Sequence, residues 1–211
     1  MTHRDRGPRQ PEAPDSGDRR LFVAVPLPES ARAAVAGIVE SVRAQELPPG
    51  MRDVRWVRVD GLHVTIRFLG PTPPDRESPT IAAMERAAAS AAPGLGRLAG
   101  SGVFPRHGRP RTLWIGIDAG ADALGAIAAT LGRELEGAGW PSDDRPFRAH
   151  LTLARSDGLV AGPLVARRLD AAIGEGAIPF AIERLVLYES VTGGGPARYV
   201  PVAEAPLSGT A

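Results

Sequence analysis

The sequence contains no cysteine and no lysine among its 211 residues. The absence of cysteine excludes disulfides, thiolate metal sites and cysteine nucleophiles. The absence of lysine excludes a Schiff base, a lysyl-nucleotide ligase intermediate and the lysine of a phosphate-binding P-loop. All 25 basic residues are therefore arginine, and with 24 acidic residues the formal net charge is only +1. So small a charge provides no general attraction to nucleic acid.

Long apolar runs are also missing. No segment approaches the ~18–20 apolar residues that cross a bilayer, and the N-terminal segment lacks the apolar core of a secretory signal. We therefore expect a cytoplasmic protein without a membrane partner. Residues 1–20 are charged, rich in proline and nearly without apolar side chains, so we predict a disordered tail. Residues 21–205 are predicted as one bilobal domain, followed by a C-terminal tail, 206–211.

Strand and helix patterns follow one another irregularly along the chain. Short apolar or alternating runs predict strands at 21–27, 54–59, 62–70, 97–105, 111–118, 148–155, 178–190 and 197–205. Alanine-rich segments with helical spacing predict helices at 31–45, 80–92, 121–139 and 163–173, with a loop at 71–79. Several strands are joined directly by turns. This order favours an α+β fold with antiparallel sheets over a regularly alternating parallel fold.

Two of the predicted strands carry the same motif, His-x-Thr. LHVTIRFLG contains His63 and Thr65, and AHLTLAR contains His150 and Thr152. Because side chains alternate along a strand, each His–Thr pair lies on one face and the apolar residues take the other. Each half of the chain also presents strand, helix and motif-bearing strand in the same order. This weak repeat predicts two lobes related by a pseudo-two-fold axis, with outer helices and a central cleft.

The residue types in these motifs suit phosphodiester cleavage by an acid and a base. Histidine titrates near neutrality, so one neutral and one protonated imidazole can coexist. The threonine hydroxyls can donate hydrogen bonds to phosphate oxygens as negative charge builds there. A single histidine on a polar strand face is ordinarily a solvated residue, but two in equally patterned strands favour a paired site. Acidic residues do not cluster with either motif, so we expect no metal and no other cofactor.

LHVTIRFLG and AHLTLAR resemble the two signature motifs of the two-histidine phosphoesterases. Within that superfamily the chain is most similar to the RNA 2′,3′-cyclic phosphodiesterases, also named 2′-5′ RNA ligases. The resemblance extends over about residues 20–205 and includes the RLFVAVPLP and GVFPRHGRPRTLWIGI segments. It implies a bilobal α+β fold and metal-independent opening of 2′,3′-cyclic phosphates to 2′-phosphates. Many members also join or cleave 2′-5′ linkages without ATP.

The resemblance further implies a role for each motif residue. His63 would be the acid that protonates the leaving 3′ oxygen, and His150 would be the base that activates water. The motif residues alone do not show which histidine is the acid and which is the base. Thr65 and Thr152 would hold the phosphate. The partner would be RNA with a 2′,3′-cyclic phosphate end or a small cyclic nucleotide, bound by a monomer.

Phe68 and Arg155 also match the family, each five residues after its histidine. Phe68 would stack on the terminal base, and Arg155 would stack there or reach the phosphate. Strict alternation puts both on the face opposite their histidine, so a strand end or bulge has to turn them toward the cleft. Alternation also puts Arg67 beside His63, where we expect it to be exposed.

Other interpretations remain open. The same site could act on a different cyclic phosphate or on a 2′-5′ oligonucleotide, or the protein could bind RNA ends or nucleotides without catalysis. Retention of both histidines and both threonines argues against a binding module, since binding requires no acid–base pair. The aromatic residues Phe22, Trp56 and Trp114 are predicted to be core.

Overall fold

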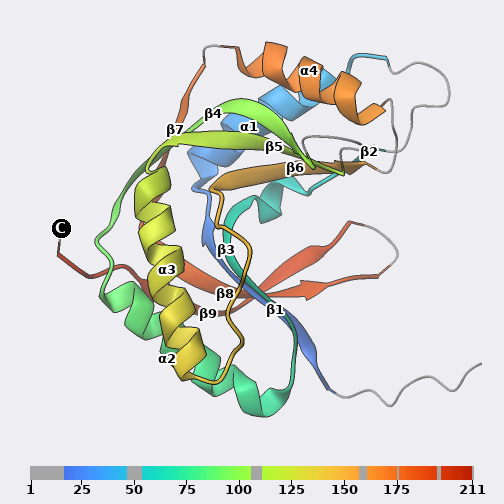
Figure 1. The fold of residues 1–211 in the computed structure, drawn as a ribbon. Coiled ribbons are helices and arrows are strands. Elements are labelled where there is room, and N and C mark those ends of the chain that lie inside the picture. The colour runs from blue at the N-terminus through green and yellow to red at the C-terminus, as the bar shows by residue number, and fades with distance from the viewer. Residues whose placement is uncertain are drawn as a thin grey trace, which may run out of the picture.

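The computed structural model describes residues 17–46, 54–105, 111–156, 161–174, 176–193 and 196–210. Within these ranges the strands are β1 (Arg19–Pro26), β2 (Val54–Trp56), β3 (His63–Thr72), β4 (Gly94–Phe104), β5 (Thr112–Ala119), β6 (His150–Ser156), β7 (Ile178–Ile182), β8 (Arg184–Val191) and β9 (Arg198–Pro206). The helices are α1 (Glu29–Arg43), α2 (Pro74–Ala89), α3 (Ala121–Gly137) and α4 (Ala161–Ile173). All strand pairs are antiparallel, which confirms the predicted α+β class (Figure 1).

The strand order in the sheet is β7-β4-β5-β6-β3-β1-β8-β9, and β2 pairs with β6. This order is symmetric about the boundary between β6 and β3, so each lobe contributes four consecutive strands. The predicted repeat is present as β1-α1-β3 and β5-α3-β6, with one His-x-Thr motif at the start of β3 and of β6. The two lobes are joined into one continuous sheet where β3 meets β6, rather than forming separate sheets.

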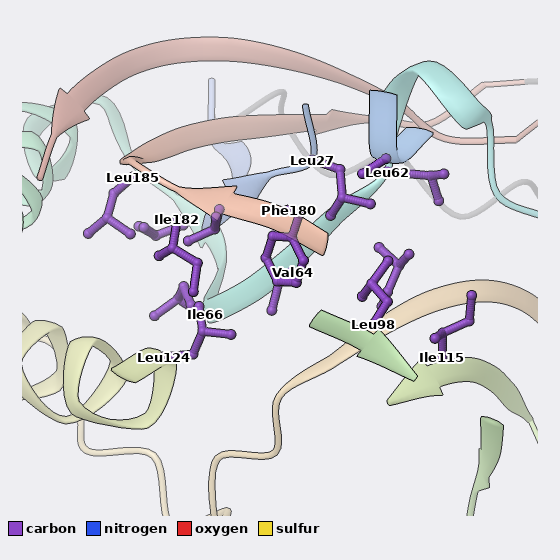
Figure 2. Packing of buried hydrophobic residues seen from close by; sticks show 14 of the residues in the cluster. Leu27, Leu62, Val64, Ile66, Leu98, Ile115, Leu124, Phe180, Ile182 and Leu185 are labelled. Atoms are coloured by element: carbon purple, nitrogen blue, oxygen red, sulfur yellow. The ribbon is translucent and has the colours of Figure 1, made fainter. Parts of the chain in front are cut away.

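The helices pack in two pairs on the two lobes. The first pair, α1 and α4, contacts β7 and β4, and the second pair, α2 and α3, contacts β8, β9 and β3 (Figure 1). The hydrophobic core includes Val64 and Ile66 of β3 and Leu124 of α3, which Figure 2 shows together. The apolar positions of the motif strands therefore point inward, as alternation predicts. None of the helices in the described ranges is long and apolar enough to cross a membrane.

Three predicted elements differ from those in the structure. The strand predicted at 54–59 ends at Trp56, and Val59–Gly61 form a short 3₁₀ helix. The segment predicted as a loop, 71–79, contains the first turns of α2, which begins at Pro74. Proline at the first helical position and the acidic side chains of Asp75 and Glu77 in the first turn favour this earlier start. The predicted strand 178–190 is two strands, β7 and β8, which belong to different lobes.

The fold extends past both predicted boundaries of the domain. Strand β1 begins at Arg19, whose guanidinium binds Glu77 at 2.8 Å and Glu189 at 2.7 Å. At the other end, Leu207 is buried and the Gly209 N–H donates to the Ala91 carbonyl at 3.0 Å. Positions 19–20 and 206–209 are therefore part of the fold rather than tails. The rest of the predicted N-terminal tail, 1–16, lies outside the described residues.

Candidate active site

The two motif strands meet at a single pair of buried residues. Val64 of β3 lies opposite Leu151 of β6 in antiparallel register. Continuing this register places His63 opposite Thr152 and His150 opposite Thr65. Opposed side chains in a sheet are about 5 Å apart at Cβ, and diagonal ones about 7–8 Å. The register therefore places the two His–Thr pairs side by side, with the two histidines on a diagonal.

Both imidazoles are oriented by the same kind of hydrogen bond. His63 Nδ1 lies 2.6 Å from the Gly61 carbonyl, and His150 Nδ1 lies 2.7 Å from the Arg148 carbonyl. A carbonyl oxygen only accepts, so Nδ1 carries the hydrogen in both rings. Nε2 of each neutral ring therefore has a free lone pair for chemistry in the cleft. The carbonyl belongs in each case to the residue two positions before the histidine.

Aromatic side chains surround each histidine. The centroid of the His63 ring is 4.8 Å from that of Phe22 and 4.9 Å from that of Tyr199. His150 meets the ring of Phe104 at 5.0 Å and that of Trp114 at 6.1 Å. Phe22 is buried, as predicted, but it and Trp114 pack against the histidines rather than in the main core cluster, whereas Trp56 packs on that core. Local sequence does not distinguish these two buried environments.

Burial lowers the pKa of both histidines. For His63 burial is the main cause, the Gly61 carbonyl opposes it, and the pKa falls from 6.5 to about 4. A charge on His150 would lower that pKa further. The pKa of His150 is also lowered, mainly by burial and in addition by the charge of Arg155. Both imidazoles are therefore neutral near pH 7 in the free protein.

A β-bulge in β3 turns Phe68 toward the cleft. The register with β1 pairs Thr65 with Ala24 and Arg67 with Val23, so Ile66 is the extra residue. The bulge reverses the alternation, and Phe68 consequently pairs with Phe22. The two rings are 5.9 Å apart, and 55% of Phe68 is exposed. Of the two predicted possibilities, a strand end or a bulge, this strand contains the bulge.

The second motif strand contains the same irregularity at the same position. The register of β6 with β5 pairs Thr152 with Trp114 and Ala154 with Leu113, which leaves Leu153 as the extra residue. Leu153 and Ala154 are consequently both buried, and Arg155 is exposed on the cleft side. Each bulge lies three residues after its histidine, so the local two-fold symmetry includes the bulges as well as the His-x-Thr motifs.

The bulge also changes the place of Arg67. The expectation that Arg67 is exposed beside His63 is wrong, because the reversed alternation turns its side chain toward the segment between α3 and β6. Its Nη2 donates to the Pro141 carbonyl at 2.5 Å, and its Nη1 lies 3.6 Å from the Asp143 carboxylate. Only 13% of the Arg67 side chain is exposed. Arg67 therefore fixes the backbone of that segment.

Two adjoining cavities flank the His–Thr cluster. One, of about 490 Å³, is lined by all the predicted site residues except His150, together with residues that include Tyr199. The other, of about 690 Å³, is lined by His150 and by one face of α3. Thr65, Phe68 and Arg145 line both. All six predicted site residues therefore lie around one continuous cleft, to which Arg145 was not predicted to contribute.

The described part of the chain contains no group of three or more His, Cys, Asp or Glu side chains that could hold a metal ion. The lining of the cleft includes two imidazoles, two threonine hydroxyls, several arginines and the carboxylates of Glu136 and Asp143. Such a set can transfer protons and bind an anion.

A two-lobed antiparallel sheet with a His-x-Thr motif in each central strand defines a class of phosphoesterase folds, and comparison with known proteins agrees. The chain belongs to the 2′-5′ RNA ligase superfamily, whose family model matches residues 27–194. It is 32% identical over 190 residues to an RNA 2′,3′-cyclic phosphodiesterase of Geobacillus stearothermophilus, with 89% of this chain and 57% of that protein covered. The chain thus spans less than two thirds of that relative.

A second protein of the same name, from Thermus thermophilus, is 38% identical over 143 residues, which cover 64% of this chain and 68% of that protein. Among solved structures, TT0787 of Thermus thermophilus has a TM-score of 0.70 at 28% identity, covering 90% of this chain and 98% of that one. E. coli LigT complexed with 3′-AMP also has a TM-score of 0.70, at 26% identity and with 90% and 99% covered. These matches confirm the predicted family and fold.

Proposed function

We propose that this protein hydrolyses RNA 2′,3′-cyclic phosphate ends to 2′-phosphates without a metal ion, with His63 and His150 as acid and base. The observation that carries the proposal is the diagonal His–Thr cluster, in which both imidazoles present Nε2 while Nδ1 is held by a carbonyl. Relatives named RNA 2′,3′-cyclic phosphodiesterases support the choice of substrate. Since both motifs belong to one chain, we further propose that the protein acts as a monomer. We also propose that it acts in the cytoplasm.

The reaction is a single displacement at phosphorus. The phosphate binds between the two imidazoles, and the hydroxyls of Thr65 and Thr152 donate to its non-bridging oxygens. His150 Nε2 takes a proton from water as the water oxygen bonds to phosphorus. The bond from phosphorus to O3′ breaks, and His63 Nε2 gives its proton to O3′, which leaves a 2′-phosphate. The proton balance is restored by exchange with solvent.

The acid must carry a proton that the free protein does not hold at neutral pH. The lowered pKa of His63 means that its imidazole is neutral before substrate binds. A phosphodiester anion within a few ångströms favours the charged imidazolium and raises the pKa of both histidines. We therefore propose that the substrate itself recruits the catalytic proton. Phe68 would stack on the terminal base and Arg155 would bind the phosphate or that base.

The direct test is a product analysis. The purified protein is incubated with 2′,3′-cyclic AMP and with an RNA ending in a 2′,3′-cyclic phosphate, with and without EDTA. We expect 2′-AMP and a 2′-phosphate end at rates that EDTA does not change. A 3′-phosphate product, or activity that EDTA abolishes, would contradict the proposed mechanism. Binding of both substrates without turnover would instead support a binding module.

Two further substrates distinguish the RNA cyclic phosphate from the other substrates considered, a different cyclic phosphate and a 2′-5′ oligonucleotide. ADP-ribose 1″,2″-cyclic phosphate and a 2′-5′ oligoadenylate are assayed beside the RNA. We expect kcat/KM to be highest for the RNA cyclic phosphate. A higher value for the ADP-ribose compound would move the proposal to that substrate while leaving the site unchanged. A 5′-hydroxyl in place of water would turn the same displacement into ATP-independent 2′-5′ joining.

A further inference from the structure

Tyr199 reaches His63 from the edge of the sheet. It belongs to β9, which is separated from β3 by β1 and β8. Neighbouring strands are about 4.8 Å apart, so in a flat sheet three spacings would put β9 about 14 Å from β3. The centroid of the Tyr199 ring is nevertheless only 4.9 Å from that of His63. The sheet therefore curls so that this ring from the last strand lies over the cleft beside the motif histidine.

The same ring packs directly on Gly61, whose carbonyl orients His63. A Cβ at Gly61 would lie 2.8 Å from Cδ2 and 3.4 Å from Cε2 of Tyr199, and the former distance is too short for two carbon atoms. Gly61 does not have a positive φ. This glycine is therefore needed for the close approach of the tyrosine ring and not for its backbone conformation.

Tyr199 thus contacts both partners of one hydrogen bond. The imidazole of His63 donates from Nδ1 to the Gly61 carbonyl at 2.6 Å. The planes of the His63 and Tyr199 rings are perpendicular, at 89°, and perpendicular aromatic pairs with centroids about 4.5–7 Å apart are favoured. The ring is consequently placed to limit both the rotation of the imidazole and the movement of the carbonyl.

We infer that Tyr199 is a positioning residue for His63, whose ring holds the imidazole and the carbonyl that orients it. The role in catalysis rests on the proposed function. The hydrogen bond made by Nδ1 determines that Nε2 of the neutral imidazole has the free lone pair. Nε2 then faces the phosphate and, once protonated, delivers its proton to O3′. Without the tyrosine ring the imidazole gains freedom to rotate, and Nε2 is no longer aligned with the leaving oxygen.

The second histidine has a ring in a comparable position. Phe104 of β4 lies 5.0 Å from His150, and the two ring planes meet at 86°. Its strand is also not a neighbour of the motif strand, since β5 lies between β4 and β6. Phenylalanine has no hydroxyl, so the feature common to the two lobes is an aromatic ring perpendicular to the imidazole. This supports a role for the ring of Tyr199 rather than for its hydroxyl.

The Tyr199 ring also excludes water from His63. Burial is the main cause of the lowered pKa of His63, which is about 4. The other titratable groups near the imidazole are His150 of β6 and Tyr188 of β8. The cationic side chains that line the same cavity are those of Arg20, Arg145 and Arg155. All of these groups remain in a Tyr199 variant, so a change in the pKa of His63 there reports the loss of the ring.

The first test is an NMR titration of labelled histidine in the absence of substrate. In Tyr199→Ala we expect the pKa of His63 to rise from about 4 toward 6.5, because water reaches the imidazole. We also expect a larger fraction of the neutral ring to carry its hydrogen on Nε2. Tyr199→Phe retains the ring and should match the wild type in both respects. Phe104→Ala is the matched control, since it should raise the pKa of His150 and change that of His63 little.

The second test separates kcat from KM for 2′,3′-cyclic AMP. Tyr199→Ala is expected to lower kcat by about 10- to 100-fold, because a small misplacement of a reacting group costs about this much. The change in KM should be smaller, and Tyr199→Phe should restore kcat. Gly61→Ala should reproduce the effects of Tyr199→Ala on kcat and on the pKa of His63, because its Cβ displaces the ring. Gly37→Ala is the control for that substitution, since a Cβ at Gly37 meets no atom within 4 Å.

Two results would overturn the inference. The first is a folded Tyr199→Ala in which the pKa and the protonated nitrogen of His63 are those of the wild type. The second is a Tyr199→Phe that loses as much kcat as Tyr199→Ala, because the hydroxyl rather than the ring would then be needed. Should Tyr199→Ala not fold, Gly61→Ala applies the same test with the tyrosine present. Failure of the wild type to open any cyclic phosphate would contradict the proposed function, whereas the titration without substrate would still decide whether Tyr199 positions His63.

Discussion

Val64 of β3 and Leu151 of β6 lie opposite one another, and the cleft repeats about this pair. On each side a histidine is followed two residues later by a threonine, three residues later by a β-bulge, and five residues later by a side chain that faces the cleft. The symmetry ends at that last position, where one strand has Phe68 and the other has Arg155. This difference places one aromatic and one cationic side chain at symmetry-related positions of the cavity beside His63. We expect it to determine in which direction a nucleotide binds.

Folding stability should depend on pH through His63. Its pKa is about 4 in the folded protein against 6.5 for the unperturbed group, so the unfolded chain binds more protons between these values. The contribution of the neutral, buried imidazole is therefore fully present above pH 6.5 and is lost as pH falls toward 4, by about 3 kcal/mol in the free energy of unfolding. Urea unfolding of the wild type and of His63→Asn, measured from pH 7 to pH 4, gives the difference. If the free energy of unfolding falls equally in both proteins between pH 7 and pH 4, His63 is not the group that causes the loss of stability.

The pKa of His150 is lowered mainly by burial, and the charge of Arg155 should lower it further. Arg155 lowers that pKa in the structure, so Arg155→Gln is expected to raise it. Because the active free protein needs one proton on the histidine pair, kcat/KM falls as pH rises above the pKa of the more basic histidine. In Arg155→Gln the fall in kcat/KM should therefore begin at a higher pH than in the wild type. NMR titration of labelled histidine should show the pKa of His150 raised by the same amount. If the pH at which kcat/KM begins to fall is unchanged while KM rises, Arg155 binds substrate without affecting the pKa of His150.

Phe68 should contribute to substrate binding and little to stability. Its ring is 55% exposed at the cleft, and stacking of one base on an aromatic side chain contributes about 1–3 kcal/mol. Phe68→Ala is therefore expected to raise KM for an RNA cyclic phosphate by about 5- to 100-fold, with a small change in the free energy of unfolding. Phe68→Trp should preserve KM. The control is Leu95→Ala, because Leu95 is also exposed, at 75%, but does not line either cavity.

An unchanged KM in Phe68→Ala would contradict the stacking role. A loss of stability as large as that of a core substitution, about 3–5 kcal/mol for Phe to Ala, would show instead that the ring is part of the core through Phe22. The two outcomes are separated by measuring KM and urea unfolding on the same preparation.

The sequence predicted most of the strands, the fold class and the His–Thr pairs because alternation is a local property of each strand. It required a strand end or a bulge before Phe68 and Arg155, and the structure contains a bulge in each motif strand. The side-chain direction of Arg67 could not be predicted without locating that bulge, since a bulge depends on the register with a neighbouring strand. The early start of α2 was not predicted because prolines are loop signals, although proline also suits a first helical position.

The lining contributed by α3 and by Arg145 could not be predicted from the sequence. Arg145 lies in an irregular segment whose path depends on tertiary contacts such as that between Arg67 and Asp143. The glycines of α3 weaken a helix pattern without indicating what they face. Only the packing of the two lobes determines which helix face borders the cleft.

The measurement that tests the central claim most directly is kcat for 2′,3′-cyclic AMP in His63→Ala, His150→Ala and the double variant. The account predicts that each single variant loses about 100- to 10,000-fold in kcat. It also predicts that the double variant loses little more than either single one, because the two imidazoles act as one unit. Retention of more than about a tenth of wild-type kcat in either folded single variant would contradict catalysis by this pair.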